Sequence, residues 1–206
     1  RTVNEIMTLI VGITGGIASG KTTISNFLKK KKYAVHESDA VVKKIYSKPT
    51  PKLIKHLKQI NLSDSIKKNK INKVKIRKEI FNNKRKKMML EKFIHKEVRI
   101  SRNEFLKKHK TQKTKIVFLD IPLLFESFLE KKCNKTIFLY TPLALRKRRA
   151  LNRKGMQRKI LEKIIKSQLN DKTKKLRADY IVNTSKKKNK TFKDLLKTIN
   201  IILENA

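Results

Sequence analysis

The segment from Gly15 to Thr23 constrains the fold of this chain more than any other. Gly15 and the run Gly20-Lys21-Thr22 have the spacing G-x-x-x-x-G-K-[ST], which is typical of a loop that binds the phosphates of a nucleotide. Glycine is needed there because a Cβ atom would keep the backbone away from the anion. The apolar run Leu9 to Ile13 precedes the loop and an amphipathic segment follows it. We therefore expect the loop to join a buried strand to a helix.

The motif assigns functions to individual residues of this loop. We expect the backbone N–H groups to hold the phosphates of ATP, the Lys21 ammonium to reach the outer phosphates and act in catalysis, and the Thr22 hydroxyl to bind Mg²⁺. Asp120 ends the apolar run Ile116 to Leu119 and is the second expected Mg²⁺ ligand. The nucleotide-binding residues of the loop are Gly15, Gly16, Ile17, Ala18, Ser19, Gly20, Lys21, Thr22 and Thr23.

Hydrophobic patterning predicts an α/β fold. Five short apolar segments read as strands, namely residues 9–13, 33–36, 116–120, 136–140 and 180–182, and helical patterns alternate with them. This alternation predicts a P-loop kinase fold, a doubly wound five-stranded parallel sheet with the first strand in the centre. We expect one domain, 1–206, with a core at 8–50 and 113–204, a helical acceptor-binding insertion at about 51–112 and a lid at about 146–170.

Composition adds weaker constraints. The 55 Lys and Arg against 16 Asp and Glu give a formal net charge of +39, but these cations are scattered through nearly every polar segment and no aromatic platform accompanies them. We interpret them as solvated positions, so that nucleic acid binds only unspecifically. No run reaches the eighteen or so apolar residues of a membrane helix. The single cysteine, Cys133, cannot form an intramolecular disulfide, which favours a cytoplasmic location.

Residues outside the loop select the class of reaction. The Asn-Lys-x-Asp segment of switch GTPases is absent from the strand ends, and Asp120 lacks the following Glu of motor ATPases. A small phosphotransferase remains. Asp39 follows the second strand and is the candidate general base that accepts the proton of the acceptor hydroxyl, with a helix N-cap as the alternative. Arg146, Arg149 and Arg153 suit a lid that stabilises the transferring phosphoryl group, with a solvated helix face as the alternative.

Several segments together resemble the dephospho-CoA kinase family over residues 8–198. The matching residues, in the family's order, are Thr14 to Lys21, Glu37-Ser38-Asp39, His95 with Arg99, Pro122-Leu123-Leu124-Phe125-Glu126, Arg149 with Arg153 and Gly155, Gln168, and Ala178-Asp179-Tyr180. The family's pattern is broken at Ser38, Lys96, Lys154 and Ile164.

The resemblance implies transfer of the ATP γ-phosphate to the ribose 3′-hydroxyl of dephospho-CoA. Independently of it, we expect a monomer or weak homo-oligomer. Under it, Asp39, Lys21 and Arg149 are catalytic, and Arg149 and Arg153 also bind the nucleotide. The acceptor-binding residues that it implies are Asp39, His95, Arg99, Leu123, Leu124, Phe125 and Glu126. The alternatives are another small-molecule or nucleoside kinase and a basic nucleic-acid-binding protein that keeps the nucleotide fold.

Overall fold

The computed structural model describes residues 7–68, 70–81 and 83–206 and divides them into two compact units. The first, here called the sheet unit, holds the chain up to Glu37 and from Lys108 onward. The second, the helical unit, is Ser38–Lys107. This division assigns the segment after Glu37 to the helical unit, whereas the sequence pattern placed the boundary near residue 51.

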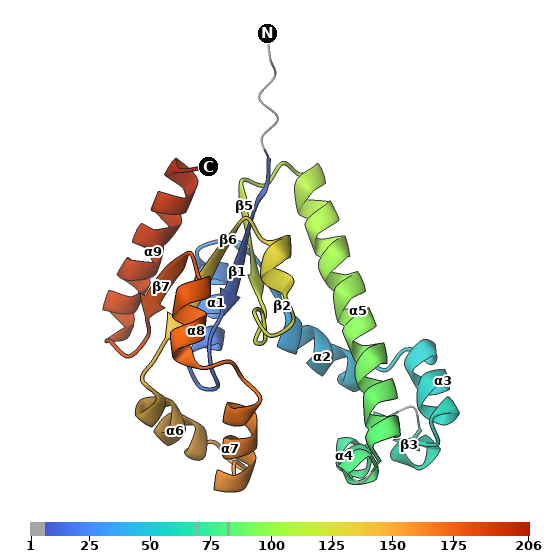
Figure 1. Ribbon diagram of the computed structural model, residues 1–206. Helices are drawn as coiled ribbons and strands as arrows, with labels where there is room; N and C mark the ends of the chain where they lie inside the picture. Colours follow the sequence, from blue (N-terminus) through green and yellow to red (C-terminus); the bar gives the residue numbers. More distant parts are fainter. Residues whose placement is uncertain (1–6, 69, 82) are drawn as a thin grey trace. The chain divides into compact units, whose positions relative to one another are not determined.

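The sheet unit contains a five-stranded parallel sheet in the order β2-β5-β1-β6-β7 (Figure 1). Its central strand is β1, as predicted, and both Val11 and Ile13 are completely buried in it. The strands are β1 (Leu9–Thr14), β2 (Ala34–Glu37), β5 (Ile116–Asp120), β6 (Lys135–Tyr140) and β7 (Tyr180–Asn183). The carboxyl ends of these parallel strands share one edge of the sheet, which is where ligands bind in folds of this class.

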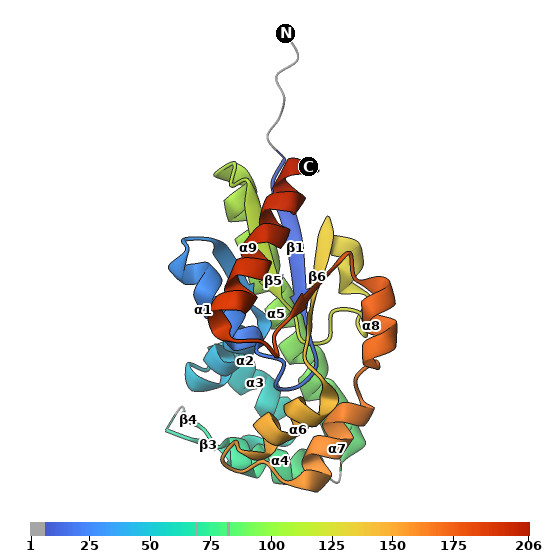
Figure 2. The ribbon, with the colours of Figure 1, turned by 90° about the vertical axis from the view of Figure 1, so that its left-hand side faces the viewer.

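Helices cover both faces of this sheet, which confirms the doubly wound fold. α1 (Lys21–Lys30) and α9 (Lys188–Glu204) lie side by side on one face, where Phe27 stacks on Phe192 with ring centroids 4.0 Å apart. α8 (Asp171–Arg177) lies on the other face (Figure 2). The remaining helices of the unit are η2 (Leu129–Lys132), α6 (Leu143–Leu151) and α7 (Arg158–Lys166).

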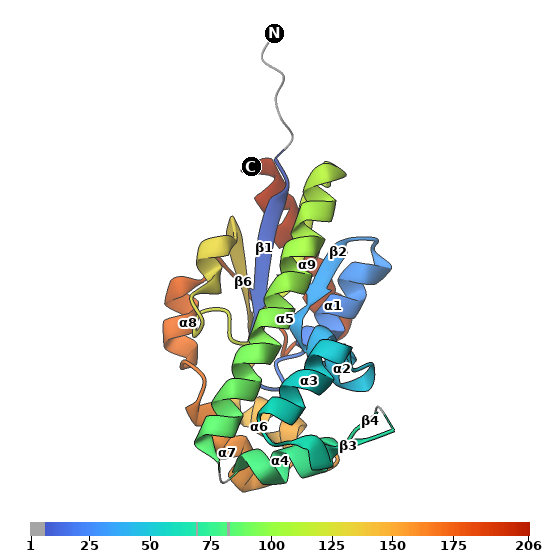
Figure 3. The same ribbon diagram turned by 90° about the vertical axis from the view of Figure 1, so that its right-hand side faces the viewer.

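The helical unit consists mainly of helices (Figure 3). They pack around an apolar cluster of their own, in which Leu53, Leu57 and Leu90 are buried. The Thr50 side chain caps α3 by accepting a hydrogen bond from the Leu53 N–H, and Pro51 fills the first helical position. The elements are α2 (Ser38–Ser47), α3 (Pro51–Gln59), η1 (Ser63–Ser65), β3 (Ile66–Lys67), β4 (Lys70–Ile71), α4 (Lys73–Phe81) and α5 (Lys84–Thr111), whose last turn belongs to the sheet unit.

Two local features complete the description. The polar stretch from Asn61 to Asn72 forms η1 and the hairpin of β3 and β4. Gln157 is extended, and α7 begins directly after it. Among the helices that the structure describes, none is both long and apolar enough to span a bilayer.

Candidate active site

The phosphate loop leaves β1 at its carboxyl end and enters α1 in the way that the motif predicts. Gly20 has φ 90° and occupies the N-cap of α1, a left-handed conformation that glycine adopts without strain. The Ser19 N–H donates to the Gly16 carbonyl at 3.1 Å, which closes the turn. Thr22 and Thr23 are exposed in the first turn of the helix. The positive end of the α1 dipole and these polar groups make an anion-binding surface.

Lys21 and Gly15 are held together across the loop. The Lys21 ammonium donates a hydrogen bond to the Gly15 carbonyl at 2.9 Å, so the side chain folds back over the loop. A Cβ atom on Gly15 would lie 2.4 Å from the Ser19 hydroxyl oxygen and 2.9 Å from the Leu139 carbonyl oxygen of β6. The loop therefore rests directly on the sheet, and glycine is required at this position by packing as well as by ligand approach.

Two threonines, each the first residue after β6 or β7, support the phosphate loop by hydrogen bonds. The Thr184 hydroxyl donates to the Ser19 carbonyl at 2.7 Å, and the Thr141 hydroxyl contacts Thr184 at 2.6 Å. All three residues are buried. Thr141 and Thr184 were not predictable from the sequence, because a single threonine after a strand carries no signal that separates it from an ordinary turn residue.

Asp120 lies at the carboxyl edge of the sheet next to the phosphate-loop strand. In the sheet, Asp120 pairs in register with Ile13 of β1 and with Glu37 of β2. One carboxylate oxygen accepts a hydrogen bond from the Ser25 hydroxyl at 2.8 Å, one helical turn after Thr22. The carboxylate is 8% exposed. Carboxylate and hydroxyl oxygens are the hard ligands that Mg²⁺ prefers. The two predicted metal ligands, the Asp120 carboxylate and the Thr22 hydroxyl, are therefore of a suitable chemical kind.

The lid segment, defined as α6, α7 and the turn between them (Leu143–Lys166), carries the predicted arginines with different surroundings. Arg149 is half-buried and donates to the Thr184 carbonyl at 3.3 Å, whereas Arg153 is exposed. Arg146 is only 6% exposed, and its guanidinium is bound by the Asp171 carboxylate at 2.7 Å. The prediction that Arg146 offers its charge to a phosphate is therefore wrong, because that charge is already paired inside the protein.

Asp39 belongs to the helical unit, in the first turn of α2. Its side chain is exposed and makes no hydrogen bond or ion pair with the residues that the structure describes. The strand that precedes it, β2, is not adjacent to the phosphate-loop strand β1, since β5 lies between them. The ends of β2 and β5 nevertheless share one sheet edge, since Glu37 pairs with Asp120. Asp39 follows two residues later.

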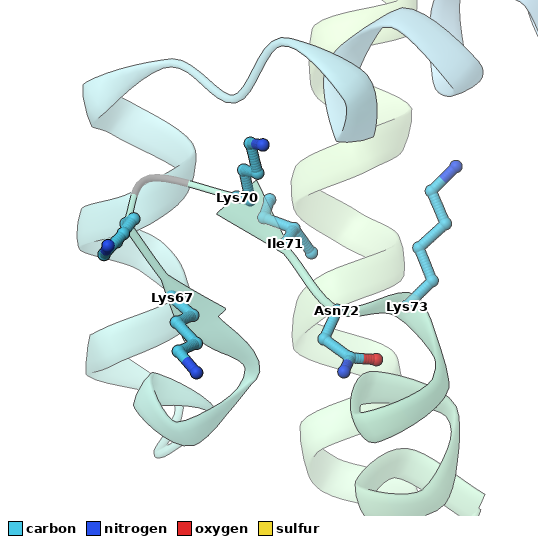
Figure 4. Close-up of a pocket in the computed structure, with 6 residues that line it drawn as sticks. Lys67, Lys70, Ile71, Asn72 and Lys73 are labelled. Carbon is cyan, nitrogen blue, oxygen red and sulfur yellow. The ribbon is translucent and has the colours of Figure 1, made fainter.

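His95 and Arg99 are exposed on one face of α5, one helical turn apart. The same unit has a pocket of about 600 Å³ at the β3–β4 hairpin, lined by Lys67, Lys68, Lys70, Ile71, Asn72 and Lys73. In Figure 4 the labelled lysine side chains diverge, with Lys67 and Lys70 pointing in opposite directions. Because these ammonium groups do not converge on one point, the hairpin lacks the geometry of a dedicated anion site.

The segment after β5 was expected to face the acceptor, and the structure divides it. Leu124 and Phe125 are completely buried, so their side chains are not accessible to a ligand in this conformation. Leu123 is 42% exposed. The Glu126 carboxylate accepts a hydrogen bond from the Leu169 N–H at 2.9 Å and pairs at 2.8 Å with the ammonium of Lys174, whose side chain is 0% exposed. Glu126 therefore has structural partners inside the sheet unit.

Comparison of the sequence with those of known proteins indicates one family. A family model described as "Dephospho-CoA kinase" matches residues 9–190. A dephospho-CoA kinase of Bartonella quintana is 36% identical over 197 residues, which cover 95% of this chain and 99% of the relative. One of Fusobacterium nucleatum is 33% identical over 199 residues, 95% of this chain and 97% of the relative.

Solved structures agree with this result. A protein described as "TT1252 from Thermus thermophilus" superposes with a TM-score of 0.80 at 26% identity, covering 95% of this chain and 98% of that one. A dephospho-CoA kinase from Campylobacter jejuni gives 0.72 at 26% identity, with coverage of 97% and 99%. A shikimate kinase from Aquifex aeolicus, at 0.51 and 17% identity, shares the fold alone.

Proposed function

Because this chain belongs to the dephospho-CoA kinase family, it transfers a phosphate group from ATP to dephospho-CoA, and we propose how its residues divide that reaction. The observation that supports the donor side is the complete phosphate loop between β1 and α1, with Lys21 drawn across it. The loop N–H groups bind the β- and γ-phosphates. Lys21, Arg149 and Arg153 stabilise the charge that spreads over the transferring phosphoryl group.

On the acceptor side, Asp39 is the general base. The carboxylate accepts the proton of the ribose 3′-hydroxyl while that oxygen forms its bond to the γ-phosphorus and the bond from phosphorus to ADP breaks. The exposure of Asp39 and its lack of a partner among the described residues leave it available for this step. His95, Arg99 and Leu123 contact the acceptor. All three are exposed, whereas Leu124 and Phe125, which follow Leu123, are buried and pack inside the protein.

Mg²⁺ is bound at Thr22 and Asp120. Their oxygen ligands, together with the Ser25 hydroxyl that orients the Asp120 carboxylate, support this assignment. When bound, the ion neutralises charge on the phosphates. We also propose that nucleic acid is attracted only unspecifically by the +39 charge, since the hairpin lysines diverge instead of forming a site.

Release of ADP by the purified protein tests the substrate assignment directly. We expect ADP release from ATP and Mg²⁺ to be stimulated by dephospho-CoA and not by nucleosides or nucleoside monophosphates. Coenzyme A, which already carries the 3′-phosphate, is the matched control and is expected to give no stimulation. Stimulation by a nucleoside alone would move the acceptor assignment to another class of small kinase.

We expect Glu126→Gln to lower stability without weakening acceptor binding. The amide still accepts the Leu169 N–H, but the buried Lys174 ammonium loses its counter-charge, which costs about 3 kcal/mol of unfolding free energy. Thermal melting measures the loss, and the KM for dephospho-CoA is expected to stay within about twofold of the wild-type value. Glu79→Gln, which breaks a more exposed pair with Lys86, is the control and costs at most about 1 kcal/mol. A large rise in that KM at unchanged stability would return Glu126 to the acceptor site.

A further inference from the structure

The guanidinium of Arg146 connects α6 to the phosphate loop. Its Nε donates to the Thr141 carbonyl at 3.0 Å. One terminal nitrogen donates to both oxygens of Asp171, at 2.7 and 2.8 Å. The other lies against the loop, because a Cβ atom on Gly16 would come within 1.9 Å of it. The buried cation therefore touches the loop backbone while its charge is satisfied by Asp171.

The other end of the lid segment is tied to the next residue of the same loop. The side-chain oxygen of Gln168, two residues after α7, accepts a hydrogen bond from the Ile17 N–H at 3.1 Å. Leu169 follows and is held by Glu126. Asp171, the partner of Arg146, is the first residue of α8. The two ends of the lid segment therefore contact adjacent residues of the phosphate loop, Gly16 and Ile17. The ion pair between Arg146 and Asp171 joins these two ends.

Anchoring Arg146 also orients Arg149. The two residues are three positions apart on α6, so they lie on the same side of the helix, where Ala150 is completely buried. A helix fixed at Arg146 cannot rotate about its axis without breaking the contacts to Asp171 and Thr141. Arg149, which donates to the Thr184 carbonyl next to the loop, then has its direction set by that anchor.

We propose that Arg146, Asp171 and Gln168 are positioning residues, here called the lid anchor, which fix the base of the lid segment to Gly16 and Ile17 and so set the place of Arg149. The proposal rests on the proposed function, in which Arg149 acts on the transferring phosphoryl group. None of the three needs to touch a substrate. Their effect on the reaction passes through the loop on one side and through α6 on the other.

Two substitutions test the lid anchor. Asp171→Asn keeps the size of the side chain but removes the charge that binds Arg146, and Gln168→Met keeps its length but removes the acceptor of the Ile17 N–H. In each variant we expect about a tenfold higher Kd for ATP and about a tenfold lower kcat, with the KM for dephospho-CoA within about twofold of wild type. The Kd is measured by calorimetry without acceptor, so it tests the anchor even if dephospho-CoA is not the substrate.

Asp194→Asn is the matched control, since it breaks an ion pair of 2.8 Å with Lys186 that is 34% to 37% exposed in the same unit. It is expected to leave the Kd for ATP and kcat unchanged. Lower melting temperatures for Asp171→Asn and Gln168→Met with unchanged Kd and kcat would reduce the anchor to a structural role and overturn the proposal. No change in any measurement would overturn it too. If Asp171→Asn does not fold, Gln168→Met alone tests the proposal, because the Gln168 side chain is neutral and only half-buried.

Discussion

Asp39→Asn is expected to lower kcat by about 10²- to 10⁴-fold, because the amide cannot accept the proton of the acceptor hydroxyl. The Kd for ATP is expected to stay within about twofold of wild type, and the free energy of unfolding within about 0.5 kcal/mol. The side chain is exposed and has no partner among the described residues, so the change removes a proton acceptor without breaking a structural contact. Steady-state kinetics with ATP and dephospho-CoA, calorimetry with ATP and thermal melting measure the three quantities.

The same substitution separates the catalytic interpretation from the structural alternative. Asparagine caps a helix about as well as aspartate, so a residue that serves only the amino end of α2 would leave kcat unchanged in Asp39→Asn. Asp64→Asn supplies the control, since it removes an exposed carboxylate of the same helical unit and is expected to have no effect on kcat. A wild-type kcat for Asp39→Asn would therefore exclude this residue as the base.

The sheet and the loop were predictable because their signals are local. The strand β1 is buried on both faces and so reads as a continuous apolar run, and the loop after it must have glycine where the backbone meets the anion or the sheet. The order of the strands was not predictable in the same way. Apolar runs show that β2 and β5 are strands, but only the packed sheet shows that β5 separates β2 from β1.

The errors at the site concern side chains whose environment depends on distant residues. Lys174 belongs to a run of basic residues and looks like any solvated lysine in a chain of this charge, yet it is completely buried against Glu126. Arg146 is likewise indistinguishable from Arg149 in the sequence, and only Asp171, 25 positions later, removes it from the set of free cations. Long-range pairing of this kind leaves no periodic pattern.

Gly15→Ala is expected to raise the Kd for ATP by about 10²-fold or more. The added methyl group meets the Leu139 carbonyl at 2.9 Å, and this carbonyl belongs to β6, which is bonded to β1 and β7 and cannot yield. The loop must move instead, and its N–H groups lose their alignment with the phosphates. Overpacking is also expected to cost about 1 to 3 kcal/mol of stability. Calorimetry with ATP and thermal melting of the free protein measure the two effects separately.

Gly12→Ala distinguishes loop geometry from a general loss of stability. A methyl group there meets the Cys133 sulfur at 2.9 Å and a Leu124 methyl at 3.0 Å, so this variant crowds the strand that leads into the loop. The close neighbours of Gly12 are side-chain atoms and not backbone atoms, and the phosphate loop begins three residues later. Gly12→Ala should therefore melt earlier than wild type and still bind ATP normally. Equal losses of ATP affinity in both variants would mean that the loop responds to the stability of the whole sheet, and that its glycine serves packing more than phosphate recognition.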